Sequence, residues 1–578
     1  MLLSTNPHKM TDTMKRIFLF LFAAVCAANS LRAYDFKSGD LYYNIINDTV
    51  APYEVEVTYQ YNDTNNYSGL TTVVIPSSVD YNSRTYEITS IESGAFKSCK
   101  SLTSITIPEN VTNIGNNSFV YCDSLTDVVW KAKKCTCQFP FVILLEMSGD
   151  LVVSDTILHI TSFTFGNEVE YIPNGVCYGL SDLTSITIPE SVTSIGSSAF
   201  AGCTGFTSMT IPKSVEFISI NAFRGCYNLA DVHIEGATTI VCDAFEGCSN
   251  LTKLVCDETV SVYNIGGYGR TILANLSRLD TLVTSAQVFD VSEGNWAVQP
   301  KNIRYIKVND GELTDNAFNV ILRNYKTLNY LDIEGTANTS LSDKAFQECY
   351  NLRTLVLPAQ LTAIPYKAVA DCQLLQSITI PATVTEIDNS AFENCRSIRS
   401  IVFEAETAPA GAGQYAPAAN GSALWRIGNW AFYNCHELQH LDIPEGVTEI
   451  GDGAFYGCVY LEDMVLPASV QEIGDNTFAL CAKVQKITVN ALTPPTIQAK
   501  TFYDVNRRIP VYVPEEAVAD YKADDLWKEF NIIGYDAPSS IGNTQVQADG
   551  TAQKIIRDGQ VLIQRGEKVY TLMGQEIR

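Results

Sequence analysis

Short apolar stretches recur along the chain at a nearly constant interval of 23 residues. In the unit "SGAFKSCKSLTSITIPENVTNIG", which begins at Ser93, Leu102, Ile105 and Ile107 alternate with small polar residues before Pro108. Alternation of this kind predicts a strand with one buried face, and proline suits a strand end because it lacks a backbone donor. Each unit can bury its apolar face only by stacking on its neighbours.

Cysteines mark the same interval. Eleven of them occupy one equivalent position: Cys99, Cys122, Cys203, Cys226, Cys248, Cys349, Cys372, Cys395, Cys435, Cys458 and Cys481. Free cysteine is among the most buried residue types, and side chains of stacked units run parallel instead of facing each other. We therefore predict a buried row of free thiols. The better disulfide candidates lie outside this row: Cys135, Cys137, Cys177, Cys242 and Cys256.

The repeats predict an α/β repeat solenoid that is rich in β structure. About sixteen strand-bearing coils fit between residues 91 and 514. The coils between 261 and 340 are irregular, and we expect helix in the connection "LTDNAFNVILRNYKTLNYLDI". Insertions at 131–156 and 405–426 interrupt the repeat, and such insertions usually lie on one face of a solenoid.

The N-terminus has the pattern of an export signal. Lys15 and Arg16 precede an apolar run from Ile17 to Ala28, and small residues lead to a cleavage site after Ala33. Met14 is an alternative start, and Cys26 an alternative site of lipid anchoring. Because no later stretch has about 18 uninterrupted apolar residues, we predict no integral membrane span. The chain is expected to be exported to the cell surface or the extracellular space.

The repeat unit resembles the BspA-like leucine-rich-repeat proteins of bacterial cell surfaces, which are common in the Bacteroidetes. The resemblance covers nearly all of residues 36–578, with Cys177 and Val369 as departures at phenylalanine positions. It implies a right-handed leucine-rich-repeat superhelix with a β-strand N-terminal cap. It also implies protein–protein interaction, in particular adhesion to host or bacterial proteins. In the first clear unit the residues that carry it are Ala95, Phe96, Cys99, Leu102, Ile105, Ile107, Pro108, Val111 and Ile114.

These features divide the chain into segments. They are a signal peptide (1–33), an N-terminal β cap (34–90), a first block of leucine-rich repeats (91–260), irregular repeats (261–340), a second block (341–492), a C-terminal capping coil (493–536) and a tail that resembles a shortened sorting module (537–578).

One string suggests metal chemistry. His436, Glu437 and His440 spell the H-E-x-x-H motif, which binds zinc when a helix places both histidines on one face. Here Leu438 is the repeat leucine and Pro444 the strand-ending proline, so the repeat predicts His436 in a turn and His440 on a strand. We therefore expect no catalytic residues, no metal site and no cofactor.

The net charge of -25 opposes binding to nucleic acid, so a protein ligand is the expected partner and a glycan the alternative. Binding is expected at positions between the buried strand residues and at two aromatic residues of the second insertion. Tyr415 and Trp425 would serve glycan binding, and a cryptic hydrolase would need His436 and His440. Ligand identity and oligomeric state stay open. The candidate partner-binding residues are Ser104, Thr106, Ser185, Thr187, Ser208, Thr210, Asp231, His233, Ser377, Thr379, His440, Asp442, Tyr415 and Trp425.

Overall fold

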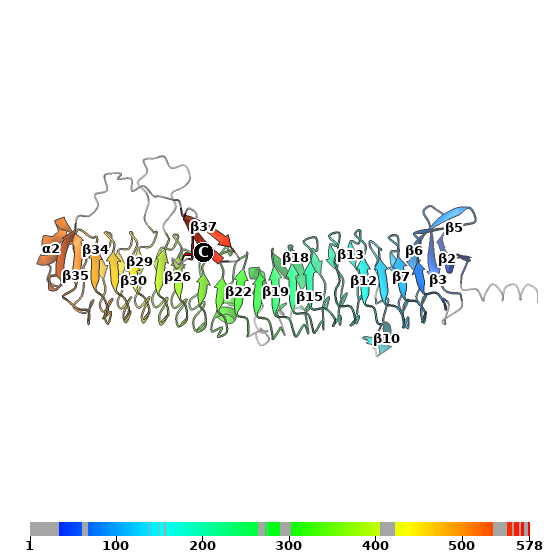
Figure 1. The fold of residues 1–578 in the computed structure, drawn as a ribbon, viewed down its shortest axis with the longest axis horizontal. Coiled ribbons are helices and arrows are strands. Elements are labelled where there is room, and N and C mark those ends of the chain that lie inside the picture. The colour runs from blue at the N-terminus through cyan, green and yellow to red at the C-terminus, as the bar shows by residue number, and fades with distance from the viewer. Residues whose placement is uncertain are drawn as a thin grey trace, which may run out of the picture.

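The chain forms an elongated β solenoid of about 17 turns, which confirms the predicted fold class (Figure 1). In Figure 1 the strands of successive coils lie side by side along the long axis. The computed structural model describes residues 34–60, 67–137, 139–147, 150–154, 158–263, 272–273, 276–289, 302–404, 422–535, 552–557, 560–565, 568–571 and 576–577. The predicted signal peptide and Tyr415 lie outside these residues.

Most coils contribute a first strand that pairs in parallel with the same strand of a neighbouring coil. Ser104 pairs with Asp127, and Ile105 with Val128, so outward and inward residues line up along the solenoid. We call the surface of these strands the strand face. They are β4 (Thr72–Val74), β7 (Ser104–Ile107), β9 (Asp127–Trp130), β12 (Ser162–Phe165), β15 (Ser208–Ile211), β17 (Asp231–Ile234), β19 (Lys253–Cys256), β21 (Thr281–Thr284), β22 (Tyr305–Val308), β23 (Tyr330–Asp332), β24 (Thr354–Val356), β26 (Ser377–Ile380), β28 (Ser400–Phe403), β30 (His440–Asp442), β32 (Asp463–Leu466), β34 (Lys486–Val489), β35 (Pro510–Pro514) and β36 (Asn531–Tyr535).

A second stack of shorter strands lies on the return side of the coils. The sequence marked these positions only as an apolar pair, such as Val111 and Ile114. We call the surface that they form the return face. They are β8 (Asn113–Ile114), β13 (Tyr171–Ile172), β14 (Ser194–Ile195), β16 (Phe217–Ile218), β18 (Thr238–Val241), β20 (Val260–Tyr263), β25 (Ala363–Ile364), β27 (Glu386–Ile387), β29 (Arg426–Ile427), β31 (Glu449–Ile450) and β33 (Glu472–Ile473).

Between the two faces the core is a column of stacked phenylalanines beside the cysteine row. The Phe432 ring lies 4.9 Å from Phe392 and 5.3 Å from Phe455, nearly parallel to both. Ten cysteines of the row donate S–H to a carbonyl of the preceding coil; Cys122 donates to Phe96 at 3.1 Å. The buried row is thus confirmed.

The expectation that Cys135, Cys137, Cys177, Cys242 and Cys256 are the better disulfide candidates is wrong, since all five are buried and none forms a disulfide. The physical reason is that such cysteines fill core positions of the repeat. Cys256 pairs with Ile234 at the inward end of its strand, and Cys177 stands where other coils have phenylalanine.

An N-terminal sheet covers the first coil. It contains β1 (Phe36–Ser38), β2 (Leu41–Asn47), β3 (Tyr53–Thr58), β5 (Ser78–Tyr81) and β6 (Arg84–Ile91). Strand β6 pairs with β8, and β4 pairs with β7, so the N-terminal residues extend both stacks. Tyr67 lies 4.9 Å from Phe96 and ends the aromatic column.

At the other end, Trp527 and Phe530 cover Phe502, with ring centroids at 5.6 and 5.3 Å. The Trp527 indole donates to the Pro495 carbonyl at 2.9 Å, which satisfies its buried N–H. The helical turns here are η5 (Glu515–Ala517), α2 (Val518–Ala523) and η6 (Trp527–Glu529).

Within residues 276–289 and 302–340 of the irregular part, which the structure describes, the helical segments are short. The connection expected to be helical forms one short segment, η4 (Ala317–Leu322), and a further turn is η2 (Ala286–Phe289). The first insertion contains the hairpin of β10 (Ile143–Met147) and β11 (Asp150–Ser154). A separate antiparallel sheet near the C-terminus contains β37 (Ala552–Arg557), β38 (Gln560–Arg565), β39 (Lys568–Thr571) and β40 (Glu576–Ile577).

Candidate interaction surface

The strand face presents outward side chains at alternate positions. Ser208 and Thr210 on β15 are exposed, and they pair in register with Asp231 and His233 on β17. His233 contacts the Asp257 carboxylate at 2.8 Å. The structure therefore brings these four predicted residues together in one sheet.

The other candidates on strands lie farther along the solenoid in separate sheets. Their strands are β7 for Ser104 and Thr106, β26 for Ser377 and Thr379, and β30 for His440 and Asp442. The Ser104 hydroxyl donates to Asp127 at 3.1 Å, and the His440 imidazole lies 3.0 Å from Asp463. The predicted set is thus a row along the molecule, not one cluster.

Three predicted residues differ from expectation. Ser185 and Thr187 are exposed but lie in irregular chain, because residues 183–189 form no strand. Trp425 does not lie in the inserted loop: its amide donates to the Thr385 carbonyl at 2.9 Å, and it directly precedes β29. Trp425 is therefore part of a coil on the return face, and its side chain is 45% exposed.

The H-E-x-x-H string forms no helix, as the repeat predicted. His436 lies in a turn and His440 is exposed on β30. Burial, together with the nearby Arg396 charge, lowers the pKa of His436. Within the described residues, no group of three or more histidine, cysteine, aspartate or glutamate side chains is placed to hold a metal ion.

An aromatic cluster that sequence reasoning missed lies on the turn that carries the Ala-Phe pair. Trp430 contacts Tyr433 edge to face at 5.4 Å and Tyr456 at 5.9 Å, while Tyr433 and Tyr456 stack at 5.3 Å. Trp430 has a left-handed φ of 59°, and its ring lies against the Gly453 backbone. We call these three residues the aromatic platform. The sequence feature that could have revealed this cluster is a tryptophan directly before the Ala-Phe pair, a position at which other units have Gly94, Gly175 or Gly453.

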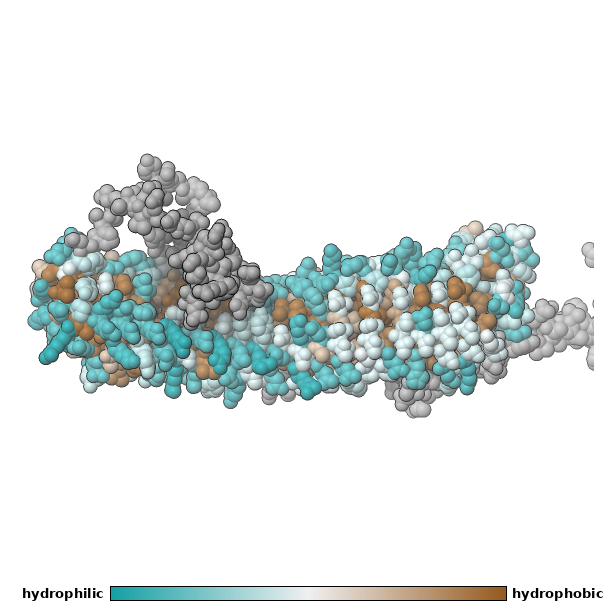
Figure 2. All heavy atoms as spheres, in the orientation of Figure 1, coloured by the Kyte–Doolittle hydropathy of each residue, from teal (hydrophilic) through white to brown (hydrophobic). Residues whose placement is uncertain are grey.

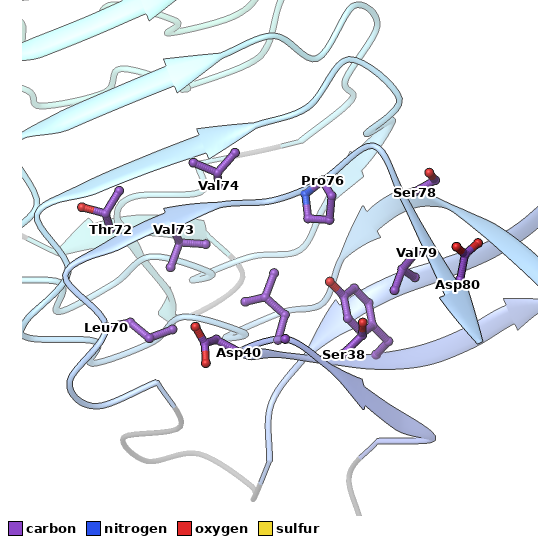
Figure 3. Close-up of a pocket in the computed structure, with 13 residues that line it drawn as sticks. Ser38, Asp40, Leu70, Thr72, Val73, Val74, Pro76, Ser78, Val79 and Asp80 are labelled. Atoms are coloured by element: carbon purple, nitrogen blue, oxygen red, sulfur yellow. The ribbon is translucent and has the colours of Figure 1, made fainter. Parts of the chain in front are cut away.

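A cavity of 460 Å³ lies at the N-terminal end, beside the edge strand β4 (Figure 3). Figure 3 shows Val73 and Val74 projecting to opposite sides of β4, and Asp40 and Asp80 supply the charged groups of the lining. The lining contains no histidine, cysteine, lysine or arginine. It therefore offers hydrogen-bonding groups and negative charge, but no nucleophile with a histidine base.

The visible surface has no single large apolar area. Figure 2 shows hydrophobic residues in small separate groups along the length of the solenoid, surrounded by hydrophilic ones. Among the described residues, no helix is both long and apolar enough to cross a membrane.

Solved structures similar to this chain include bacterial leucine-rich repeat proteins. A leucine-rich repeat protein from Bacteroides ovatus is 21% identical, covering 79% of this chain and 94% of its own, with a TM-score of 0.26. A leucine rich cell surface protein from Faecalibacterium prausnitzii is 20% identical (78% and 94% covered, TM-score 0.21). The pneumococcal vaccine antigen PcpA is 14% identical (88% and 100% covered, TM-score 0.29). A search of curated proteins gave no match.

A sequence model of the family described as "BspA type Leucine rich repeat region" matches the chain in 6 copies. The matched residues are 65–137, 155–269, 311–415 and 421–520, which amount to more than half of the chain.

Proposed function

The chain belongs to the BspA-type leucine-rich repeat family, and from this premise we propose that it is an exported protein that binds a protein ligand at the cell surface. The fold is generally used for protein interaction, and its repeat proteins are typically non-enzymatic scaffolds. Export is supported by the basic residues and apolar run that precede Ala33. Adhesion to host or bacterial protein is the role that we propose for this surface.

The observation that carries the proposal is the regular outward row on the strand face. Ser208, Thr210, Asp231 and His233 lie in register on a rigid, parallel sheet whose inward residues are fully packed. Because the backbone of this sheet is paired and its inward residues are packed before a ligand arrives, little backbone conformational entropy is lost on binding. The acidic net charge of -25 favours a partner with a basic surface.

Binding of residues 34–578 to an array of matrix proteins and glycans, read at two salt concentrations, tests the proposal. The strand-face variant is Ser208→Lys with Thr210→Lys. The matched control is Thr193→Lys with Thr385→Lys, which adds the same charge on the return face. We expect saturable protein binding that only the strand-face variant abolishes. Binding to no protein, or equal loss with both variants, would contradict the proposal, and sugar-only binding would favour the glycan alternative.

A further inference from the structure

The two strand stacks end differently at the N-terminal end of the solenoid. The return face continues into the N-terminal sheet, because β8 pairs with β6 and β6 pairs with β3. The strand face stops at β4, which pairs with β7 and, among the described strands, with no other. An edge strand of this kind presents unpaired backbone groups, which are a template for one more strand.

The hydrogen bonds around β4 show which of its backbone groups are unpaired. The Thr71 carbonyl accepts from the first amide of β7 at 3.2 Å, and the Ile75 amide donates at 3.1 Å to a carbonyl of the same strand. Backbone groups of alternate residues point to the same side of a parallel strand, so Val73 also faces β7, whereas Thr72 and Val74 face away from it. Within the described part of the chain, the free edge therefore offers two N–H donors and two C=O acceptors.

The cavity of 460 Å³ lies along this edge (Figure 3). All three residues of β4 line it, together with residues of β5, β1, β2 and the β1–β2 turn. Its volume is within the range of about 300–1,000 Å³ that ligand sites usually have. Figure 3 shows Asp40 and Asp80 at separate places of the lining, and Asp80 accepts from the Thr85 hydroxyl at 2.6 Å. In the part of the chain that the structure describes, neither carboxylate has an ion-pair partner.

A buried hydroxyl of the lining also lacks a partner. Tyr43 on β2 is only 1% exposed, and its ring stacks on Phe36 at 5.2 Å. The buried hydroxyl of Tyr67 donates to the Thr58 carbonyl, but no hydrogen bond among the described residues involves the Tyr43 hydroxyl. Burial raises the pKa of Tyr43 to about 12, so this hydroxyl is a donor at neutral pH. Because buried polar groups are normally paired, it points to a hydrogen-bond acceptor on a ligand.

We propose that the cavity beside β4 binds an extended basic segment of a protein partner, which pairs with the free edge of β4 and directs lysine or arginine side chains toward Asp40 and Asp80. An extended segment carries an N–H and a C=O group at almost every residue, so it matches the unpaired groups of Thr72 and Val74. The Tyr43 hydroxyl supplies a further donor for a carbonyl of the segment.

The charge of the segment follows from the lining. The cavity holds two carboxylates and no lysine or arginine, and the whole chain has a net charge of -25, so an acidic segment would be repelled. The inference rests on the proposed function, because it names the chemistry of the protein ligand. It places one contact of that ligand at the first strand of the strand face.

Two variants test the site, and a third is the matched control. Tyr43→Phe removes the hydroxyl and keeps the stacked ring. Asp40→Asn with Asp80→Asn removes both charges from the lining and keeps side chains of the same size. The control is Glu190→Gln with Glu216→Gln, which removes the same charge from two exposed carboxylates of coils farther along the solenoid. Thermal unfolding by circular dichroism checks that all variants fold.

The probe is a short fluorescent peptide of alternating threonine and lysine, and its binding to residues 34–578 is read by fluorescence anisotropy. A second peptide has glutamine in place of lysine. A third has a methyl group on every backbone nitrogen, so it keeps its charge but cannot donate backbone hydrogen bonds. We expect Tyr43→Phe and the aspartate variant each to weaken binding by about three- to tenfold, with the control variant unchanged. The second and third peptides should each bind at least about tenfold more weakly than the first.

Hydrogen exchange read by mass spectrometry tests whether the peptide pairs with β4. In the digest fragment that covers residues 70–75, the Thr72 and Val74 amides should exchange quickly in the free protein and become protected when the threonine–lysine peptide binds. Binding without added protection in this fragment would overturn the proposal. So would equal affinities for the first and the methylated or glutamine peptides, equal loss in the aspartate and control variants, or no saturable binding.

The array of matrix proteins and glycans separates this inference from the proposed function. If a protein of the array binds the aspartate variant and Tyr43→Phe as tightly as the native chain, only this inference fails. If the array shows no protein ligand, the proposed function fails whatever the peptide does.

Discussion

Glycines that follow the short return strands are predicted to be essential for close stacking. Gly451 follows Ile450 at the end of β31, and the Asn429 side chain of the preceding coil lies over it. There the Asn429 Oδ1 accepts a hydrogen bond from the Asp452 amide at 2.8 Å. The same arrangement recurs one coil later, where Asp452 accepts from the Asp475 amide at 2.7 Å beside Gly474.

Gly451→Ala tests this packing. A Cβ atom at this position would lie 2.4 Å from the Asn429 Oδ1 and 2.6 Å from the Asn429 backbone nitrogen. Since the backbone contact is also too close, rotation of the Asn429 side chain does not relieve the clash. Overpacking destabilises the folded state by about 1–3 kcal/mol, and the lost hydrogen bond by about 1 kcal/mol. Alanine also has less conformational freedom than glycine in the unfolded chain, which stabilises the fold by about 0.5–1 kcal/mol. The net expectation is a destabilisation of about 1–3 kcal/mol.

Hydrogen exchange read by mass spectrometry suits a solenoid because it reports local opening. For peptides that cover residues 425–476, protection should fall by about 5- to 150-fold. Gly474→Ala should behave alike, since its Cβ atom would lie 2.5 Å from the Asp452 Oδ1. The control is Gly179→Ala, where no atom lies within 4 Å and only the left-handed φ of 73° opposes alanine. Unchanged or increased protection in Gly451→Ala would refute the steric argument.

Three further predictions concern the core and the return face. Phe432→Ala removes a ring stacked at 4.9 and 5.3 Å and should lower the free energy of unfolding by about 3–5 kcal/mol in urea titrations, with Phe432→Leu costing less. Burial raises the pKa of Cys248 and of Cys256 from 9.0 to about 12, so above pH 9 the folded state retains protons that the unfolded state loses. The contribution of these two thiols to the free energy of unfolding should be constant below pH 9 and fall above it by about 1.4 kcal/mol per pH unit and thiol, and a stability that stays flat from pH 9 to 11 would contradict this. Arg426→Ala removes the ion pairs with Glu386 and Glu449 and should cost about 1 kcal/mol or less by thermal unfolding, because these groups are partly solvated.

The hydrophobic pattern was sufficient for the coil and its strand. Inward positions such as Ile105 and Ile107 follow from alternation alone, and the 23-residue interval then fixes which residues of successive coils become neighbours. The return strands were not predicted because they are mostly only two residues long, too short for alternation to be visible. The cysteine hydrogen bonds were also missed, since they depend on a carbonyl that a neighbouring coil supplies.

The errors in the predicted site had two causes, and for Trp425 the cause is uncertainty about where the repeat resumes after an insertion. Trp425 was assigned to the loop because the apolar pattern before it is weak. Its amide nevertheless donates a hydrogen bond to the Thr385 carbonyl of the preceding coil, so Trp425 already belongs to the repeat. In the coil of Ser185 and Thr187 the sequence pattern is intact, but the strand is absent. The hydrophobic pattern shows which side chains are buried. Hydrogen bonding between the strands of adjacent coils also requires that those coils align.

The repeat frame also indicates where function-specific residues should be sought. A position such as that of Trp430 is constrained by backbone conformation, so substitutions there are informative only when they go against the conformational preference. Outward strand positions such as Thr210 and Thr379 carry no such constraint, and small hydroxyls there are compatible with simple solvation of a sheet. For this reason the strand face supplies a regular surface for a partner, whereas Trp430 occupies its position against the conformational preference of the backbone.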